Sequence, residues 1–106
     1  MNADLLAIFA HPDDAELLAG GTLIKAVDQG HRVALADLTR GEMGSSGTPE
    51  IRAAEAARSA ELMGISAREN LGLPDGHLTN SDQMRRVVVE AIRKFRPRTV
   101  ITHYRV

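Results

Sequence analysis

The chain has 106 residues, of which 43% are hydrophobic and 25% are charged, a composition typical of one soluble globular domain. Its formal net charge of −1 gives no reason to expect nucleic acid or an anionic membrane as a partner. The sequence contains no cysteine, which excludes disulfides, thiolate metal sites and thiol nucleophiles. The first apolar run, residues 5–10, is too short for a signal peptide or a membrane span, so we expect a cytoplasmic protein.

In the first predicted strand, residues 5–10, the side chains that point to either face are apolar, which is typical of a parallel strand buried on both faces. It runs directly into the segment His11-Pro12-Asp13-Asp14, and a helix is predicted over residues 15–29. This helix is indicated by apolar residues at near-helical spacing: Leu17, Leu18, Ile24 and Val27. An imidazole and two carboxylates therefore stand where a strand gives way to a helix, a common place for the chemical groups of α/β proteins.

Donor chemistry predicts a metal site in this segment. A histidine nitrogen and an aspartate oxygen are good ligands for Zn²⁺, and a catalytic zinc usually takes three protein ligands. We therefore predict that His11 and Asp14 are metal ligands and that Asp13, between them, is the general base that takes a proton from water. The same ligands also suit Fe²⁺ and Co²⁺. Two alternatives stay open, since Asp13 is also typical of a helix N-cap and His11 of a hydrogen-bonded structural residue.

A second strand is predicted over residues 32–38, followed by a polar, glycine-rich loop over residues 39–47. Thr48 is predicted to cap the next helix, with Pro49 in its first turn, and this helix ends at Gly64. A loop of this kind before a helix N-terminus can also hold an anion, which gives the alternative of a phosphate- or nucleotide-binding α/β domain. The loop lacks the glycine spacing of both known phosphate-binding motifs, which counts against this alternative.

A third strand over residues 69–73 leads into a polar turn over residues 73–77. A third helix, capped at Thr79 or Ser81, then leads to a fourth strand over residues 99–102. Strands and helices thus alternate along the whole chain, with no linker or repeat that would indicate a second domain.

This alternation predicts an α/β fold, a single Rossmann-like domain over residues 1–106 with an open parallel sheet of about four strands and three helices. Every polar cluster follows a strand, so the clusters should meet at the carboxyl edge of the sheet. They are the segments 11–14, 40–47, 75–77 and 103–104. A ligand site is therefore expected at this edge.

The segment Ala10-His11-Pro12-Asp13-Asp14-Ala15-Glu16 closely resembles the opening motif of the LmbE-like (PIG-L) zinc-dependent N-acetylglucosaminyl de-N-acetylases. Further similar motifs follow in the family's order: Gly41-Glu42 with Gly44, Gly47-Thr48-Pro49-Glu50-Ile51-Arg52, Leu71-Gly72-Leu73-Pro74-Asp75-Gly76, and Thr102-His103. The resemblance covers essentially the whole chain. It implies a zinc-dependent hydrolase that removes the acetyl group from an N-acetylglucosamine-type amino sugar, a small-molecule substrate.

The resemblance implies that His11 and Asp14 are zinc ligands and that Asp13 is the general base, in agreement with the reasoning from the residues. In the family a His-x-Asp-His motif supplies the third ligand. We expect this motif beyond Val106, which would make the chain the N-terminal part of a longer deacetylase domain. His103 is a candidate substitute ligand, and a non-catalytic fragment that binds a sugar or a partner stays an alternative.

The resemblance also implies that Arg52 and Asp75 line the sugar pocket, with Glu42 beside them. Arginine donates to hydroxyls and an aspartate accepts from them, so the residue types are suitable. Two simpler roles stay open, since Arg52 could pair with Glu55 on a helix surface and Asp75 could be a turn residue. His77, in the same turn, is a candidate substrate contact.

The partners follow from the same features. The basic residues around the end of the third helix are predicted to form a solvated face and no nucleic-acid site: Arg93, Lys94, Arg96 and Arg98. No membrane insertion is expected. The fourth strand is expected at a sheet edge, where unpaired backbone groups invite another chain, so a homo-oligomer stays open.

Overall fold

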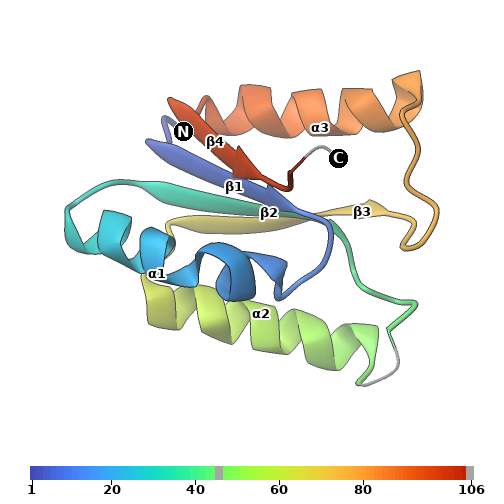
Figure 1. Cartoon of the computed structure of the whole chain (residues 1–106), viewed down its shortest axis with the longest axis horizontal. Helices are drawn as coiled ribbons and strands as arrows, with labels where there is room; N and C mark the ends of the chain where they lie inside the picture. The colour runs from blue at the N-terminus through green and yellow to red at the C-terminus, as the bar shows by residue number, and fades with distance from the viewer. Residues whose placement is uncertain (45–46, 105–106) are drawn as a thin grey trace.

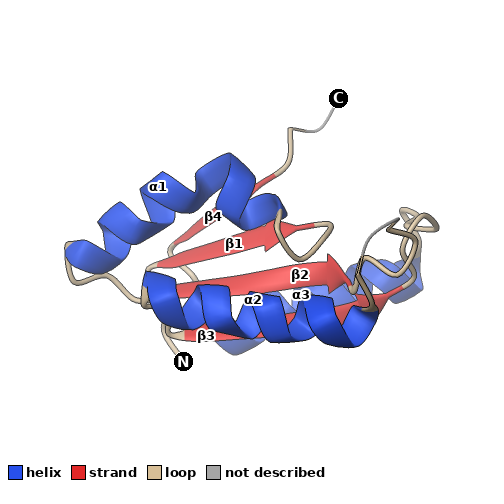
Figure 2. Ribbon diagram, turned by 90° about the horizontal axis from the view of Figure 1, so that it is seen from below, coloured by secondary structure: helices blue, strands red, loops and turns tan. Residues whose placement is uncertain are grey.

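A computed structural model describes residues 1–44 and 47–104 and confirms the predicted α/β class. The elements are β1 (Leu5–Phe9), α1 (Asp14–Asp28), β2 (Val33–Thr39), α2 (Pro49–Met63), β3 (Ala67–Leu73), α3 (Asp82–Phe95) and β4 (Thr99–Thr102). The four strands of the described residues form one parallel sheet in the order β3-β2-β1-β4. Helices α1 and α2 cover one face of this sheet, and α3 covers the other (Figure 1, Figure 2).

The strand order reverses at β1. Leu6 of β1 pairs with Ala34 of β2 on one side and with Val100 of β4 on the other. The chain leaves β1 over one face through α1, whereas it reaches β4 through α3 on the opposite face (Figure 1). Such a reversal opens a crevice at the carboxyl ends of the two central strands, which is where open α/β sheets bind ligands. β4 also lies at an edge of the sheet, as predicted.

Both faces of β1 are buried, which explains its continuous apolar sequence. Leu5, Ala7 and Phe9 pack on the face of the sheet that also buries Leu23 of α1. Leu6 and Ile8 pack on the opposite face, in the cluster that contains Phe95 of α3. The two clusters bury the central strands on both faces, so the loops at their carboxyl ends start from a packed sheet.

The helix ends follow their predicted signals. The Thr48 hydroxyl accepts a hydrogen bond from the Ile51 N–H at 3.1 Å and caps α2. Of the two predicted caps of α3, Ser81 is the one used, since its hydroxyl accepts from the Met84 N–H. α2 ends at Gly64, whose φ of 77° is the left-handed conformation that favours glycine. Within residues 1–44 and 47–104, no helix combines the length and apolar character that crossing a membrane requires.

Candidate active site

The turn after β1 places the first group of predicted site residues. The backbone N–H groups of Asp13 and Asp14 donate to the His11 carbonyl at 2.9 and 3.1 Å, and the Asp14 carboxylate accepts from the His11 N–H at 3.0 Å. Asp14 therefore closes the turn. Asp13 stands at the N-cap position of α1, but its side chain makes no capping hydrogen bond and is 57% exposed. The carboxylate of Asp13 thus remains available for proton transfer.

His11 and Asp14 also meet through their side chains. Nδ1 of His11 lies 3.2 Å from Oδ2 of Asp14. Two ligands that share a tetrahedral Zn²⁺ at about 2.0–2.1 Å stand roughly 3.3 Å apart, so this pair fits such an ion. Across residues 1–44 and 47–104, no group of three His, Cys, Asp or Glu side chains is arranged to hold a metal. In this part of the chain the pair stands alone, whereas a usual catalytic zinc takes three protein ligands.

His103 lies beside this pair at the end of β4. Its Nε2 accepts a hydrogen bond from the Ala10 N–H at 2.9 Å and lies 3.6 Å from Oδ2 of Asp14. Its ring stands edge-on against Phe9, with the ring centroids 4.9 Å apart. When Nε2 accepts from the backbone, the neutral ring carries its proton on Nδ1 and has no free lone pair for a metal. His103 therefore packs against the candidate site in an orientation that does not favour its use as a substitute ligand.

Asp75, from the turn between β3 and α3, contacts His11 from the other side. Its side chain is 7% exposed, and its Oδ1 lies 2.9 Å from Nε2 of His11. Its Oδ2 accepts a hydrogen bond from the Met43 N–H at 2.8 Å. The Met43 N–H, together with His11, holds the pKa of Asp75 below its ordinary value. Asp75 is thus a turn residue whose side chain also belongs to the site.

Glu42 reaches the site through Asp75. Its Oε2 accepts from the Asp75 N–H at 2.9 Å, and this bond holds the pKa of Glu42 below its ordinary value. His77 is exposed and its ring contacts the Asp75 carbonyl, outside the set of residues that line the pocket described below.

Arg52 lies in the first turns of α2 and points back to the loop after β2. Its Nη1 donates to the Gly41 carbonyl at 2.9 Å, and its Nη2 lies 3.8 Å from Oδ1 of Asp13. Among the ion pairs of the described residues it therefore pairs with Asp13 and not with Glu55. Gly41 has a φ of 67°, which favours glycine, and a Cβ there would lie 2.6 Å from Nη1, so Arg52 would have to move.

Four separate segments thus converge on one pocket. It is lined by His11, Asp13, Met43, Gly44, Arg52 and Asp75. Of the predicted site residues, Asp14 and Glu42 are not in this lining but bond to His11 and Asp75, which are. Ser45 and Ser46 of the glycine-rich loop, which the alternative of an anion site would use, lie outside the described residues.

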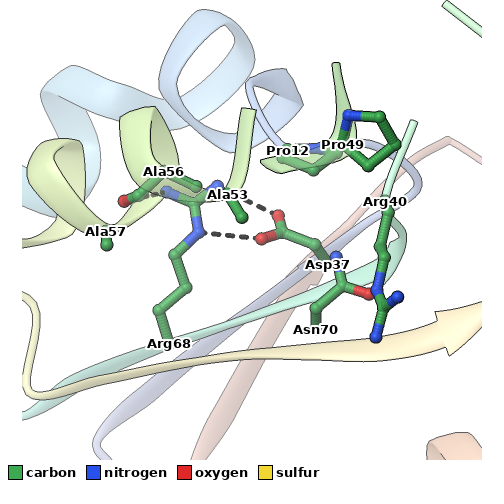
Figure 3. A pocket seen from close by; sticks show the side chains of 9 residues that line it. All are labelled: Pro12, Asp37, Arg40, Pro49, Ala53, Ala56, Ala57, Arg68 and Asn70. Atoms are coloured by element: carbon green, nitrogen blue, oxygen red, sulfur yellow. Dashed lines mark hydrogen bonds and ion pairs between the residues drawn. The ribbon is translucent and has the colours of Figure 1, made fainter. Parts of the chain in front are cut away.

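A buried charge network, which the sequence analysis missed, lies beside the site (Figure 3). Arg68 of β3 donates to both carboxylate oxygens of Asp37 at 2.8 and 3.0 Å, and to Glu16 of α1 at 2.7 Å. The side chains of Arg68 and Asp37 are 7% and 3% exposed. Because Glu16 lies two residues after Asp14, this network ties the start of α1 to the sheet.

Burial and pairing act against each other in this network. Burial raises the pKa of Asp37, although Arg68 opposes that shift. Burial also acts to raise the pKa of Glu16, but the hydrogen bonds from Arg68 outweigh it and hold this pKa below its ordinary value. The only sequence signal was a lone aspartate inside an otherwise apolar strand.

Comparisons with known proteins show the family of this chain. The sequence model of the family GlcNAc-PI de-N-acetylase (PIG-L) matches residues 6–106. The diacetylchitobiose deacetylase of Thermococcus kodakarensis is 36% identical over 105 residues, which cover 92% of this chain and 39% of the relative. The probable N-acetyl-alpha-D-glucosaminyl L-malate deacetylase 2 of Bacillus cereus is 33% identical over 116 residues, covering 98% of this chain and 53% of the relative.

A solved structure is also similar. That of a conserved protein from Thermus thermophilus superposes with a TM-score of 0.88 at 48% identity, covering 92% of this chain and 44% of that protein. The chain thus spans about half the length, or less, of the proteins it matches.

Proposed function

Because the chain belongs to the GlcNAc-PI de-N-acetylase (PIG-L) family, we propose that it carries the first part of the active site of a metal-dependent carbohydrate de-N-acetylase. The reaction is hydrolysis of the acetamide of an N-acetylglucosamine-type amino sugar, which yields acetate and a free amine. The family relatives named above are deacetylases, and one of them is named for an N-acetyl-glucosaminyl compound.

The observation that carries the proposal is the pairing of His11 with Asp14 beside an exposed Asp13. The two candidate ligands are 3.2 Å apart, and the carboxylate of Asp13 lines the same pocket as His11. We assign His11 and Asp14 as ligands of Zn²⁺, with Fe²⁺ and Co²⁺ as ions that the same donor set accepts. A bound ion of this kind would polarise the amide carbonyl and acidify water.

Asp13 then performs the proton transfer. It takes a proton from the attacking water, whose oxygen forms a bond with the amide carbonyl carbon. The carbon–nitrogen bond breaks as the nitrogen gains the proton that Asp13 took from water, which leaves acetate and the amino sugar. Nη2 of Arg52 lies 3.8 Å from Oδ1 of Asp13, so a positive charge stands beside this carboxylate.

The sugar is proposed to lie against the pocket wall formed by Arg52 and Asp75, with Glu42 beside them. Arg52 is held by the Gly41 carbonyl through Nη1, which leaves its other N–H groups to donate to sugar hydroxyls. Hydroxyl recognition by a few fixed polar groups suits a small-molecule substrate.

The test is acetate release from N-acetylglucosamine, diacetylchitobiose and an N-acetylglucosaminyl glycoside by the full-length protein. Turnover should disappear when a chelator removes the metal and return when Zn²⁺, Fe²⁺ or Co²⁺ is added. Turnover that survives complete metal removal would contradict the proposal. Sugar binding by the metal-loaded protein without acetate release would favour the non-catalytic alternative.

A further inference from the structure

The contact between Asp75 and His11 points to a task for Asp75 other than touching the sugar. Its two oxygens are both engaged inside the protein, Oδ1 with Nε2 of His11 at 2.9 Å and Oδ2 with the Met43 N–H at 2.8 Å. The side chain is 7% exposed, whereas that of His11 is 42% exposed. The buried carboxylate therefore lies behind the imidazole, on the side away from Asp14.

An ionised carboxylate only accepts hydrogen bonds, so the His11 nitrogen that faces Asp75 must donate. The proton of the neutral ring then sits on Nε2, and Nδ1 carries a lone pair. This lone pair is directed at Oδ2 of Asp14, 3.2 Å away, which is also an acceptor. Two acceptors that face each other at this distance need a proton or a metal cation between them, and the neutral ring has no second proton to place there.

We propose that Asp75 is the positioning residue of His11: it fixes the imidazole in the Nε2–H form and directs Nδ1 and Asp14 at one cation. The consequence for metal binding rests on the proposed function, in which His11 and Asp14 are ligands. Carboxylates that orient a ligating histidine in this way commonly change metal affinity roughly 10- to 100-fold when they are removed.

The two partners of Asp75 explain why a carboxylate is needed here. The Met43 N–H and the Nε2–H of His11 are both donors, and a carboxylate offers one acceptor oxygen to each. Asparagine has a single acceptor oxygen, so it satisfies only one of them. A backbone N–H cannot change its role, whereas an imidazole can move its proton to Nδ1, which would remove the lone pair that faces Asp14.

The first readout is the His11 tautomer, from long-range ¹H–¹⁵N spectra of the full chain above the pKa of its histidines, assigned with His11→Gln. The wild type should show the Nε2–H form. Asp75→Asn should populate the Nδ1–H form, and Asp75→Ala should leave a mixture. The second readout is the affinity for Zn²⁺ alone, by chelator competition, which should fall roughly 10- to 100-fold in both variants.

Glu42→Ala is the matched control, because Glu42 bonds to the Asp75 backbone N–H and not to its carboxylate. It removes a contact between the same two loops, but it should leave the His11 tautomer unchanged and the Zn²⁺ affinity within about twofold. Circular dichroism checks that each variant is folded. If Asp75→Asn does not fold, the His11 tautomer of the wild type and the Zn²⁺ affinity of Asp75→Ala still test the inference.

An Nδ1–H form in the wild type would overturn the inference, and so would an unchanged tautomer and Zn²⁺ affinity in Asp75→Asn. An equal loss of Zn²⁺ affinity in Glu42→Ala would mean that Asp75 only anchors its loop, and it would also overturn the inference. These outcomes are separate from the proposed function. A tautomer switch without any deacetylase activity would support the positioning role and count against the activity alone.

Discussion

Replacement of Arg68 by methionine should strongly destabilise the chain. The substitution removes the guanidinium but keeps an apolar side chain of similar length, and it leaves Asp37, 3% exposed, without its two hydrogen bonds from Arg68. Removal of one partner from a buried ion pair costs about 3–5 kcal/mol, because the remaining charge stays desolvated. This is a large share of the roughly 5–15 kcal/mol that stabilises a typical domain.

Urea denaturation, followed by circular dichroism, measures the change in the free energy of unfolding. The control is Arg58→Met, which removes an exposed pair with Glu61 whose side chains are 64% and 72% exposed. That loss should stay below about 1 kcal/mol. A second variant, Arg68→Met with Asp37→Leu, removes both charges and should recover most of the stability lost in the single variant.

A loss below about 1 kcal/mol in Arg68→Met would refute the reasoning, because it would mean that the network is solvated and contributes as little as a surface pair. A double variant as unstable as the single one would also contradict it. In that case packing and not the unpaired charge of Asp37 would account for the loss.

Three further predictions concern the loops and charges of the site. Gly44→Ala places a methyl group against Nη1 of Arg52, so KM for an amino-sugar substrate should rise. The control is Gly21→Ala, which has open space around it and should change neither KM nor kcat. Equal KM values for the two variants would contradict this prediction. His103→Phe should leave Zn²⁺ affinity within about threefold, because Nε2 is committed to the Ala10 N–H, and a loss of tenfold or more would show that His103 is a ligand. Because the pKa of Glu16 is lowered in the folded chain, its contribution is present above the ordinary value of 4.5 and is lost as the pH falls through the folded pKa. The difference in the free energy of unfolding between wild type and Glu16→Gln, measured by urea titration, should therefore shrink as the pH falls through the folded pKa of Glu16. A difference that stays constant with pH would contradict the lowered pKa of Glu16.

Local signals predicted most of the fold correctly. Strand β1 is short, apolar and followed by polar residues, and the caps at Thr48 and Ser81 depend on contacts within three residues. The edge position of β4 was predicted, whereas the order of the other three strands was not. The convergence of the polar segments at one sheet edge could be predicted because each of them follows a strand.

Contacts between distant segments could not be predicted from local sequence signals. The register places Leu35, and not Asp37, opposite Arg68, so the ion pair depends on a diagonal contact that no pattern in either strand indicates. The pairing of Asp75 with His11 likewise joins residues 64 positions apart.

The helical pattern of α1 was also misleading about which side is buried. Leu17 and Leu18 are 79% and 65% exposed, while the small residues Ala15 and Ala19 are buried with Leu23. The face of α1 that packs on the sheet thus combines two small side chains with one leucine, a combination that the spacing of the apolar residues alone does not indicate.

The central claim is the division of roles between the adjacent residues Asp13 and Asp14. The most direct measurement is to determine bound zinc and acetate release together, on the full-length protein, for Asp13→Asn and Asp14→Ala. The account predicts that Asp13→Asn keeps its zinc and loses about 100-fold or more of its turnover, as expected for loss of a general base, whereas Asp14→Ala loses both. Equal loss of zinc in the two variants, or full turnover in Asp13→Asn, would contradict it.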